Sequence, residues 1–363
     1  MEVVHHRYKV SPKGEDIVSS MPDIVIASIM NRLPLKEAVA TSAITKLVLN
    51  KPDWIELDVE DINHRVMFLS RIRGFEELTL TRCHKTPAKF PSHLFSCLDL
   101  KRLRLDDCVL SPPPYFHGFP KLLTLDLHDV SIRDHKYEEL IALSPLLENL
   151  EIRNSNLIGE VKLVEIAKLK NLKMILMPLC MLDNMTKIRL STVLQHLSCL
   201  PKLQELCLEF KNYEFLPEDF SQNRVSATFP FLKELCLYNV DFSRVSMFSC
   251  AFGMLFVSPN LQYLYITAMY KNVVPIPAIF PPDVDCSTMG QLQLRNVDLD
   301  SVKGLENEVW LIKYILACSP MLKSIKILLD ETIESNEKEK YKLASKLLKL
   351  HRASPIAEVI FLD

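Results

Sequence analysis

The sequence predicts an α/β solenoid, in which a curved parallel sheet carries helices on its convex side. Two observations lead to this prediction. A phrase with the pattern apolar-x-x-apolar-x-apolar recurs along most of the 363 residues, and a proline precedes most copies at a constant distance. A unit that repeats with one phase stacks into a continuous body and presents an extended surface to other molecules. Binding is therefore the expected role.

Each copy of the phrase predicts one β-strand. Because side chains alternate between the two faces of a strand, Leu103 and Leu105 should face a core, while Arg104 and Asp106 face the opposite side. One such strand cannot bury its apolar face alone, and a phrase repeated about every 28 residues is typical of leucine-rich repeats. A generic α/β protein with leucine-rich strands is the alternative. The landmark residues of the copies are Leu78, Leu103, Leu125, Leu150, Ile175, Leu206, Leu235, Leu264, Leu292, Ile325 and Val359.

The prolines predict how each repeat is divided. Several follow a serine at the end of an apolar stretch, as in YEELIALSP and LIKYILACSP. Proline disfavours helix at the residue before it and cannot continue one, so each unit reads as a helix, a proline stop and a strand. The prolines that lie five residues before a landmark are Pro120, Pro145, Pro201, Pro230, Pro259 and Pro320, and Pro355 lies four residues before Val359.

Composition excludes several classes of function. The chain is 48% hydrophobic and 24% charged with a formal net charge of −2, so no global field attracts nucleic acid or an acidic membrane. The ten cysteines form no C-x-x-C pair and are expected to be buried, reduced thiols, which indicates an intracellular protein. No apolar run reaches the ~18 residues of a membrane span. We expect a cytoplasmic or nuclear protein.

The sequence predicts no catalytic residue, no metal site and no cofactor. Its seven glycines form no phosphate-binding loop, and its ten histidines form no H-x-x-x-H or H-E-x-x-H pattern. The Cys83-His84 pair would place its two side chains on opposite faces of a strand. Nothing in the chain therefore favours an enzyme.

The first 60 residues lack the repeat and predict a small helical unit over residues 14–54. Ile24, Val25, Ile29 and Leu33 are spaced along one helical face, and Leu33-Pro34 ends that helix. A second helix is predicted from Lys36 through Leu47. Because so few residues cannot hold a core alone, the apolar face needs either the end of the solenoid or a partner.

This segment resembles the F-box. The matching residues are Met21-Pro22, Asp23, Ile24, Val25, Ile29 and Leu33-Pro34, followed by LPLKEAVATSAITK. After Thr45-Lys46 the chain departs from the pattern, since Pro52 and Trp54 stand where the family continues a third helix. The body phrase SHLFSCLDLKRLRLDDCVLSPPPYFHGFPKLLTLDLHDVSI and the ending LENEVWLIKYILACSPMLKSIKI…KLLKLHRASPIAEVIFLD resemble plant F-box/FBD/LRR-repeat proteins.

The resemblance implies a substrate-recognition subunit of an SCF-type cullin–RING ubiquitin ligase. Such a subunit would bind a Skp-family adaptor, and through it a cullin, by Met21, Pro22, Ile24, Val25, Ile29, Leu33 and Pro34, while the repeats hold a target protein. An LRR interaction module without a ligase role, whose head only caps the solenoid, is the alternative. A receptor assisted by a small molecule would need a basic pocket, and the sequence displays none.

The expected organisation is therefore an F-box-like unit at 14–54, leucine-rich repeats at 68–300 and an FBD-like closing region at 301–363. In the closing region, Tyr341, Ala344, Leu347, Leu348 and His351 should pack against the sheet as one helical face, before a last strand with Ile356, Val359 and Phe361. The target should lie on the concave face, where the candidate binding residues are Arg104, Asp106, His128, Arg153, Glu209, Tyr238, Tyr265 and Arg295.

Overall fold

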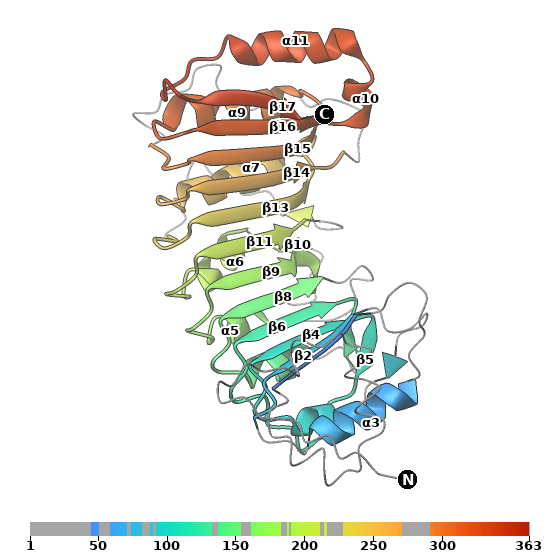
Figure 1. The fold of residues 1–363 in the computed structure, drawn as a ribbon. Coiled ribbons are helices and arrows are strands. Elements are labelled where there is room, and N and C mark those ends of the chain that lie inside the picture. The colour runs from blue at the N-terminus through green and yellow to red at the C-terminus, as the bar shows by residue number, and fades with distance from the viewer. Residues whose placement is uncertain are drawn as a thin grey trace, which may run out of the picture.

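The solenoid is confirmed by a computed structural model, which describes residues 45–50, 59–70, 74–81, 88–89, 92–132, 137–153, 161–182, 187–188, 190–210, 214–215, 228–270 and 291–362. Its main feature is a 12-stranded sheet in the order β1-β2-β4-β6-β8-β9-β11-β13-β14-β15-β16-β17 (Figure 1). The neighbouring strands of this sheet pair in parallel, so each repeat adds one strand to the stack.

The strands are short and share one register. Leu78, Leu103, Leu125, Leu150 and Ile175 pair in sequence across the sheet, as the repeated phrase predicts. The main sheet consists of β1 (Lys46–Asn50), β2 (Glu77–Thr81), β4 (Arg102–Asp106), β6 (Thr124–His128), β8 (Asn149–Arg153), β9 (Met174–Pro178), β11 (Glu205–Glu209), β13 (Glu234–Val240), β14 (Tyr263–Ala268), β15 (Asn296–Val302), β16 (Ser324–Leu329) and β17 (Glu358–Leu362).

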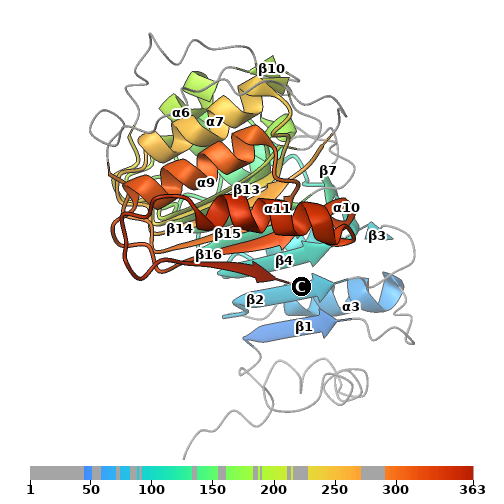
Figure 2. The same ribbon diagram turned by 90° about the horizontal axis from the view of Figure 1, so that it is seen from above.

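Helices cover one face of this sheet (Figure 2). The helices are α3 (Val59–Leu69), α4 (Tyr137–Ala142), α5 (Leu163–Ile166), α6 (Leu190–Leu197), α7 (Val245–Phe256) and α9 (Glu306–Cys318), with 3-10 turns η1 (Ser92–Ser96) and η3 (Leu179–Met181). After the last of these, α10 (Glu331–Glu334) leads to α11 (Glu337–Leu348), which lies across the C-terminal end of the stack (Figure 1). Two small sheets join the connecting segments: β3 (Ala88–Lys89), β5 (Cys108–Leu110) and β7 (Ser131–Ile132), and β10 (Lys187–Ile188) with β12 (Glu214–Phe215).

The core lies between the sheet and the helices. Leu264 and Leu235 are fully buried on the strands, and the rings of Phe252, Trp310 and Tyr314 join α7 to α9, with 5.1 Å between the Phe252 and Trp310 centroids. Each proline stop lies where the sequence predicts, since Ser258-Pro259 separates α7 from β14 and the residues Ser319-Pro320 separate α9 from β16. The two serines are buried against the helix ends.

A left-handed residue lies at the equivalent position in four repeats, directly after β4 and β6 and just before the last residue of β13 and β15. Asp107, Asp129, Asn239 and Ser301 have φ values of 51°, 49°, 61° and 61°. Asp and Asn tolerate this conformation better than most residues do. The backbone N–H of Asp107 then donates to the His128 carbonyl oxygen at 2.9 Å, and that of Asp129 donates to the Arg153 carbonyl oxygen at 2.7 Å. Each turn thereby fastens one repeat to the next.

The predicted strand at Leu292 is wrong, because β15 begins four residues later. Val297 pairs with Leu264 on one side and with Ile325 on the other, so Val297 is the landmark of this repeat. Leu292 and Leu294 are nevertheless buried. Both QLQL and NVDL place apolar residues two apart, so only pairing with the neighbouring strands distinguishes them.

The second predicted helix is wrong at its end. Lys46 and Leu47 belong to β1, which pairs in parallel with β2 and places Leu47 opposite Leu78. The repeat sheet thus begins inside the range assigned to the helical unit. Residues 1–44, which carry the F-box-like motif and all seven candidate adaptor-binding residues, lie outside the described residues. The three-part division stays a prediction.

The closing helix uses a different face from the one predicted. In α11, Leu343 and Leu347 are buried, whereas Tyr341 and Leu348 are 76% and 62% exposed and His351 is also exposed. Leu343 packs beside Gly304, where an added Cβ would lie 3.0 Å from the Leu343 Cδ1 atom. Because α11 covers the last strands and contacts α9 across the end of the stack, only one narrow face is buried (Figure 1).

The expectation of reduced thiols is wrong at Cys318, which is disulfide-bonded. The free cysteines among the described residues are Cys97, Cys108, Cys180, Cys199, Cys207, Cys236 and Cys250.

Candidate functional site: the concave face

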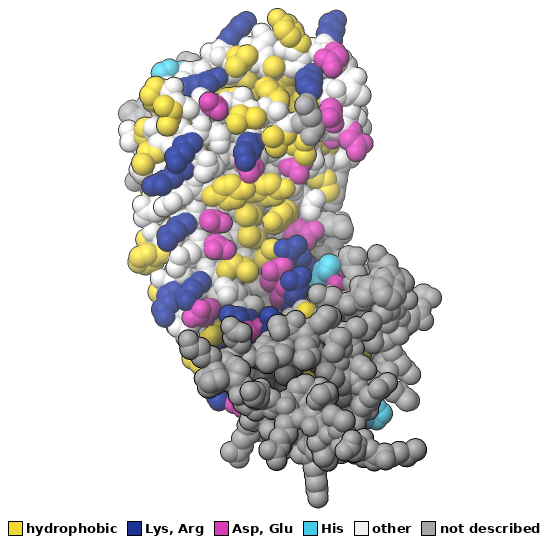
Figure 3. Space-filling view, viewed as in Figure 1, with side chains coloured by type: hydrophobic (Ala, Val, Ile, Leu, Met, Phe, Trp, Pro, Cys, Tyr) yellow, Lys and Arg dark blue, Asp and Glu magenta, His cyan; other side chains and the backbone are white. Residues whose placement is uncertain are grey.

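The concave face is the side of the sheet opposite the helices, formed by the residues that alternate with the buried landmarks. Figure 3 shows hydrophobic side chains gathered in its middle, with charged side chains around them. We call the central group the tyrosine–cysteine patch; it consists of Leu176, Cys207, Cys236, Tyr238, Tyr263 and Tyr265. It lies on the consecutive strands β9, β11, β13 and β14.

The tyrosines of the patch are held in place by one another and by the next strand. The ring centroids of Tyr238 and Tyr265 lie 5.5 Å apart. The Tyr263 hydroxyl donates to Asp298 Oδ2 at 2.9 Å, and the Tyr265 hydroxyl donates to Asp300 Oδ2 at 3.2 Å. Burial raises the pKa of Tyr265 to about 12, and the Asp300 carboxylate adds to this. These rings are fixed, neutral and half-buried, which lowers the entropy cost of binding against them.

The two cysteines of the patch form a pair. Cys207 and Cys236 occupy equivalent positions on β11 and β13 and are both half-buried. The Cys207 thiol donates a hydrogen bond that lowers the pKa of Cys236, while the same bond raises the pKa of Cys207. Glu205 and Glu234 lie next to this pair on the same face. Burial and the charge of Glu234 raise the pKa of Glu205.

A charged cluster adjoins the patch on β4, β6 and β8. The Arg104 Nε atom lies 3.2 Å from Asp126 Oδ2, and Arg153 Nε lies 2.7 Å from Glu151 Oε1. His128 Nδ1 lies 3.2 Å from Asp106 Oδ1. Burial raises the pKa of Asp126, and the nearby Glu151 charge raises it further against the opposing effect of Arg104. The arginine heads remain exposed, so they can also contact a partner.

Seven of the eight predicted binding residues lie on this face. Arg104, Asp106, His128 and Arg153 form the charged cluster, while Tyr238 and Tyr265 belong to the patch. Glu209 lies beside them and accepts a hydrogen bond from Asn239 Nδ2 at 3.2 Å. Arg295 is the exception, since it precedes β15 and lies at the edge of the sheet.

The candidate binding residues predicted from the sequence did not include several members of this surface, among them Cys207, Cys236, Asp298 and Asp300. Cys207 and Cys236 alternate with buried leucines, and this alternation indicates that they face away from the core. They were nevertheless expected to be buried, because cysteine is usually a buried residue type. Asp298 and Asp300 were missed because the strand was placed at Leu292 instead of Val297.

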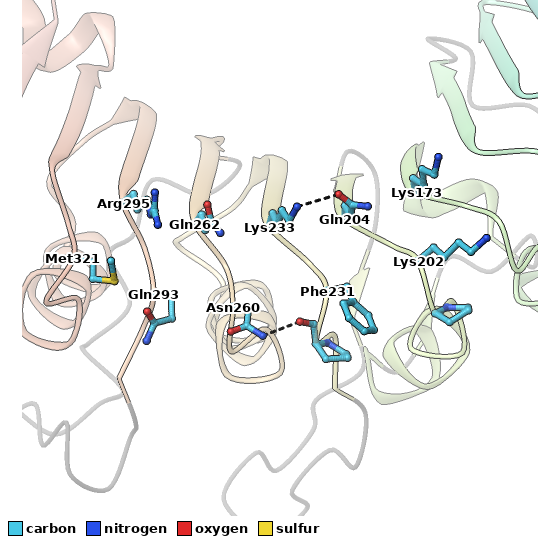
Figure 4. Close-up of a pocket in the computed structure, with 12 residues that line it drawn as sticks. Lys173, Lys202, Gln204, Phe231, Lys233, Asn260, Gln262, Gln293, Arg295 and Met321 are labelled. Carbon is cyan, nitrogen blue, oxygen red and sulfur yellow. Dashed lines mark hydrogen bonds between the residues drawn. The ribbon is translucent and has the colours of Figure 1, made fainter.

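Apart from the concave face, a groove with a volume of about 520 Å³ lies along the edge of the sheet where the strands begin (Figure 4). We call it the rim groove. One row of its lining consists of the residues that immediately precede strands: Lys173, Gln204, Lys233, Gln262 and Arg295. The other row comes from the preceding turns: Pro201, Lys202, Pro230, Phe231, Asn260, Gln293 and Met321. The expectation that the chain has no basic pocket is therefore wrong.

The residues that the structure describes contain no group of three or more His, Cys, Asp or Glu residues that could hold a metal ion. They also include no helix with the length and apolar character needed to cross a membrane.

Comparison with known proteins adds the following. Residues 65–196 match the family model described as "FBD-associated F-box protein At5g56370, LRR repeats". The chain is 26% identical over 423 aligned residues to F-box/FBD/LRR-repeat protein At1g13570 of Arabidopsis thaliana, covering 97% of this chain and 99% of that protein. It is 25% identical to F-box/FBD/LRR-repeat protein At3g26920 of the same plant, covering 97% and 98%.

Proposed function

We propose that this chain, a member of the plant F-box/FBD/LRR-repeat family, is the substrate-recognition subunit of an SCF-type cullin–RING ubiquitin ligase. The observation that carries the proposal is the extent of the similarity. It covers 97% of this chain and nearly the full length of relatives whose names include both an F-box and repeats. The shared region therefore includes the N-terminal segment with the F-box-like motif.

The proposal assigns different tasks to the two parts of the chain. Residues 21–34 bind a Skp-family adaptor, and through it a cullin, by apolar side chains that include Ile29 and Leu33. The repeats hold the target protein. The chain itself supplies no catalytic group and acts by bringing the target close to the transferring enzyme, in the cytoplasm or nucleus.

The tyrosine–cysteine patch and the charged cluster support target binding on the concave face. Tyrosine and arginine are enriched among residues that dominate binding energy, and here fixed tyrosines lie beside exposed arginines. Glu205, Glu209 and Glu234 border the patch. A target segment with an apolar anchor followed by basic side chains would complement that arrangement.

Co-purification with a Skp-family adaptor tests the ligase role. The wild-type chain should retain the adaptor, and Ile29→Asp combined with Leu33→Asp should lose it while leaving the repeats folded. Tyr238→Ala combined with Tyr265→Ala is the matched control, since it should keep the adaptor and lose targets captured under proteasome inhibition. Failure of the wild-type chain to bind any Skp-family adaptor would contradict the proposal.

A second candidate is an interaction module without a ligase role, and the position of β1 favours it. This strand extends the repeat sheet directly after Thr45, where the family pattern would lead into a further helix. The head would then serve as a cap. Deleting residues 1–44 separates the two functions, because loss of a cap lowers the stability of the repeats, whereas loss of an adaptor site leaves it unchanged.

A further inference from the structure

We propose that the rim groove binds an extended, acidic protein segment that carries an apolar side chain. The surface is separate from the concave face, so the inference goes beyond the proposed function and does not depend on a ligase role. Equivalent positions at the edge of the sheet carry different charges in different repeats.

In the N-terminal repeats, and at Lys173 at the first position of the rim groove, lysines at the edge of the sheet are neutralised by a carboxylate one repeat earlier. The Lys101 Nζ atom lies 2.7 Å from Glu76 Oε1, and Lys173 Nζ lies 2.8 Å from Glu148 Oε2. In the turn row, Lys121 Nζ lies 2.6 Å from Asp99 Oδ1. Each cation therefore carries its own counter-charge.

Beyond Lys173, amides replace those carboxylates along the rim groove. Lys233 donates to Gln204 Oε1 at 3.3 Å, in the position that Glu148 takes beside Lys173. Lys202 donates to Asn171 Oδ1 at 2.8 Å, in the position that Asp99 takes beside Lys121. Arg295 follows Gln262 in the same row. An amide orients the cation and brings no negative charge, so these three cations form no ion pair with any residue that the structure describes.

The nearest acidic residues along the chain do not neutralise the groove. Glu205 and Glu234 each follow a lining residue, but they are the first residues of β11 and β13 and belong to the concave face. Within the described part of the chain, no ion pair joins either of them to Lys202, Lys233 or Arg295. The rim groove therefore favours an anionic partner.

Apolar side chains make the groove a site for protein and distinguish it from a site for a simple polyanion. Phe231 is 58% exposed and Met321 is 47% exposed, and both line the groove beside Pro201 and Pro230. The row from Lys173 to Arg295 crosses four strand intervals of ~4.8 Å, or about 19 Å. An extended chain covers that length in about six residues. Alternating acidic and apolar side chains would meet both the cations and Phe231.

Fluorescence polarisation of the full chain with a labelled peptide tests this directly. The probe is a peptide of about ten residues that alternates glutamate with leucine and phenylalanine, sized by ~3.3 Å per residue. Replacing its glutamates by glutamine gives the uncharged control peptide. We expect only the acidic peptide to bind, with an affinity that falls as salt rises.

Sets of substitutions in the chain test whether the charge of the rim groove determines peptide affinity. Gln204→Glu with Gln262→Glu restores the missing carboxylates, and Lys202→Gln with Lys233→Gln and Arg295→Gln removes the cations. Each set should weaken binding at least ~10-fold. Lys101→Gln with Lys121→Gln is the matched control, because these lysines are already neutralised, and it should change affinity less than ~2-fold. Circular dichroism checks that every variant is folded.

Phe231→Ser and a polyphosphate competitor decide the class of ligand. A protein ligand requires Phe231→Ser to weaken peptide binding while polyphosphate binding is unchanged. The proposal is overturned if the wild-type chain does not bind the acidic peptide, if the control set loses as much affinity as the groove sets, or if Phe231→Ser has no effect on the peptide.

Discussion

Cys207 and Cys236 lie directly opposite each other on the adjacent parallel strands β11 and β13, with both side chains on the concave face. Their hydrogen bond makes the pair asymmetric, since it lowers the pKa of Cys236 and raises that of Cys207. The thiolate is the reactive form of cysteine, so the two residues should differ in reactivity.

Iodoacetamide at neutral pH should therefore modify Cys236 several-fold faster than Cys207. Cys207→Ala should slow the modification of Cys236, because it removes the hydrogen bond that stabilises the thiolate. Peptide mass spectrometry over time measures both rates. Cys97 serves as an internal control, because burial raises its pKa to about 12. Equal rates at both residues, unaffected by Cys207→Ala, would contradict the asymmetry.

Glu308 should make stability depend on pH. Burial raises its pKa to about 7, although the Tyr270 hydroxyl and the backbone N–H of Leu305 donate to it. Between the unfolded pKa of 4.5 and about 7, the folded state keeps a proton that the unfolded state has lost. The free energy of unfolding should therefore fall as pH rises through this range.

Glu308→Gln removes this titration while keeping hydrogen-bonding capacity. The stability of the variant relative to the wild type should rise by up to about 3 kcal/mol between about pH 5 and pH 8. Urea unfolding of both proteins at the two pH values measures the difference. Parallel pH profiles would show that Glu308 is not the responsible group.

Glycine at position 301 should preserve the stability of the fold, whereas valine should lower it. The φ of Ser301 is 61°, a left-handed conformation that glycine adopts freely and a β-branched residue adopts poorly. Ser301→Gly should change stability by less than ~1 kcal/mol, and Ser301→Val should cost about 1–2 kcal/mol. Chemical denaturation measures both. Equal stability of the two variants would argue against a left-handed conformation at Ser301, and so against the register shift that β15 makes there.

Gly118 should be far less tolerant of alanine than Gly74. Both have positive φ, at 87° and 80°. A Cβ at Gly118 would lie 1.8 Å from the Leu143 carbonyl oxygen, whereas one at Gly74 would meet no atom within 4 Å. Gly74→Ala should cost about 1 kcal/mol from backbone strain alone, and Gly118→Ala should cost at least ~2 kcal/mol more because the backbone must move. Thermal unfolding compares them, and similar losses would contradict the close approach.

Much of the fold could be predicted because each repeat carries its own signal. Alternation placed Leu103 in the core and Arg104 on the concave face, and the proline stops separated helix from strand. The same local logic placed seven of the eight candidate binding residues on the face where they lie. It failed where two local patterns were equally good, as at Leu292 and Val297, since pairing between strands decides the register.

The α11 helix shows a second limit of prediction from the sequence. Its sequence offers Tyr341, Leu347 and Leu348 as one apolar face, but the structure buries Leu343 and Leu347. Periodicity states which residues share a face, while the neighbouring elements decide how wide the buried face is. Here the space beside Gly304 selects Leu343.

The sequence by itself determined the repeat, the parallel strands and the direction of alternate side chains, because these follow from residue spacing within one unit. Only the tertiary structure decided the start of the sheet at β1, the pairing of Cys207 with Cys236 and the cations of the rim groove. These features join residues about 30 positions apart. They arise when successive repeats stack in register. The residues of a single repeat do not determine which residues of the next repeat they will contact.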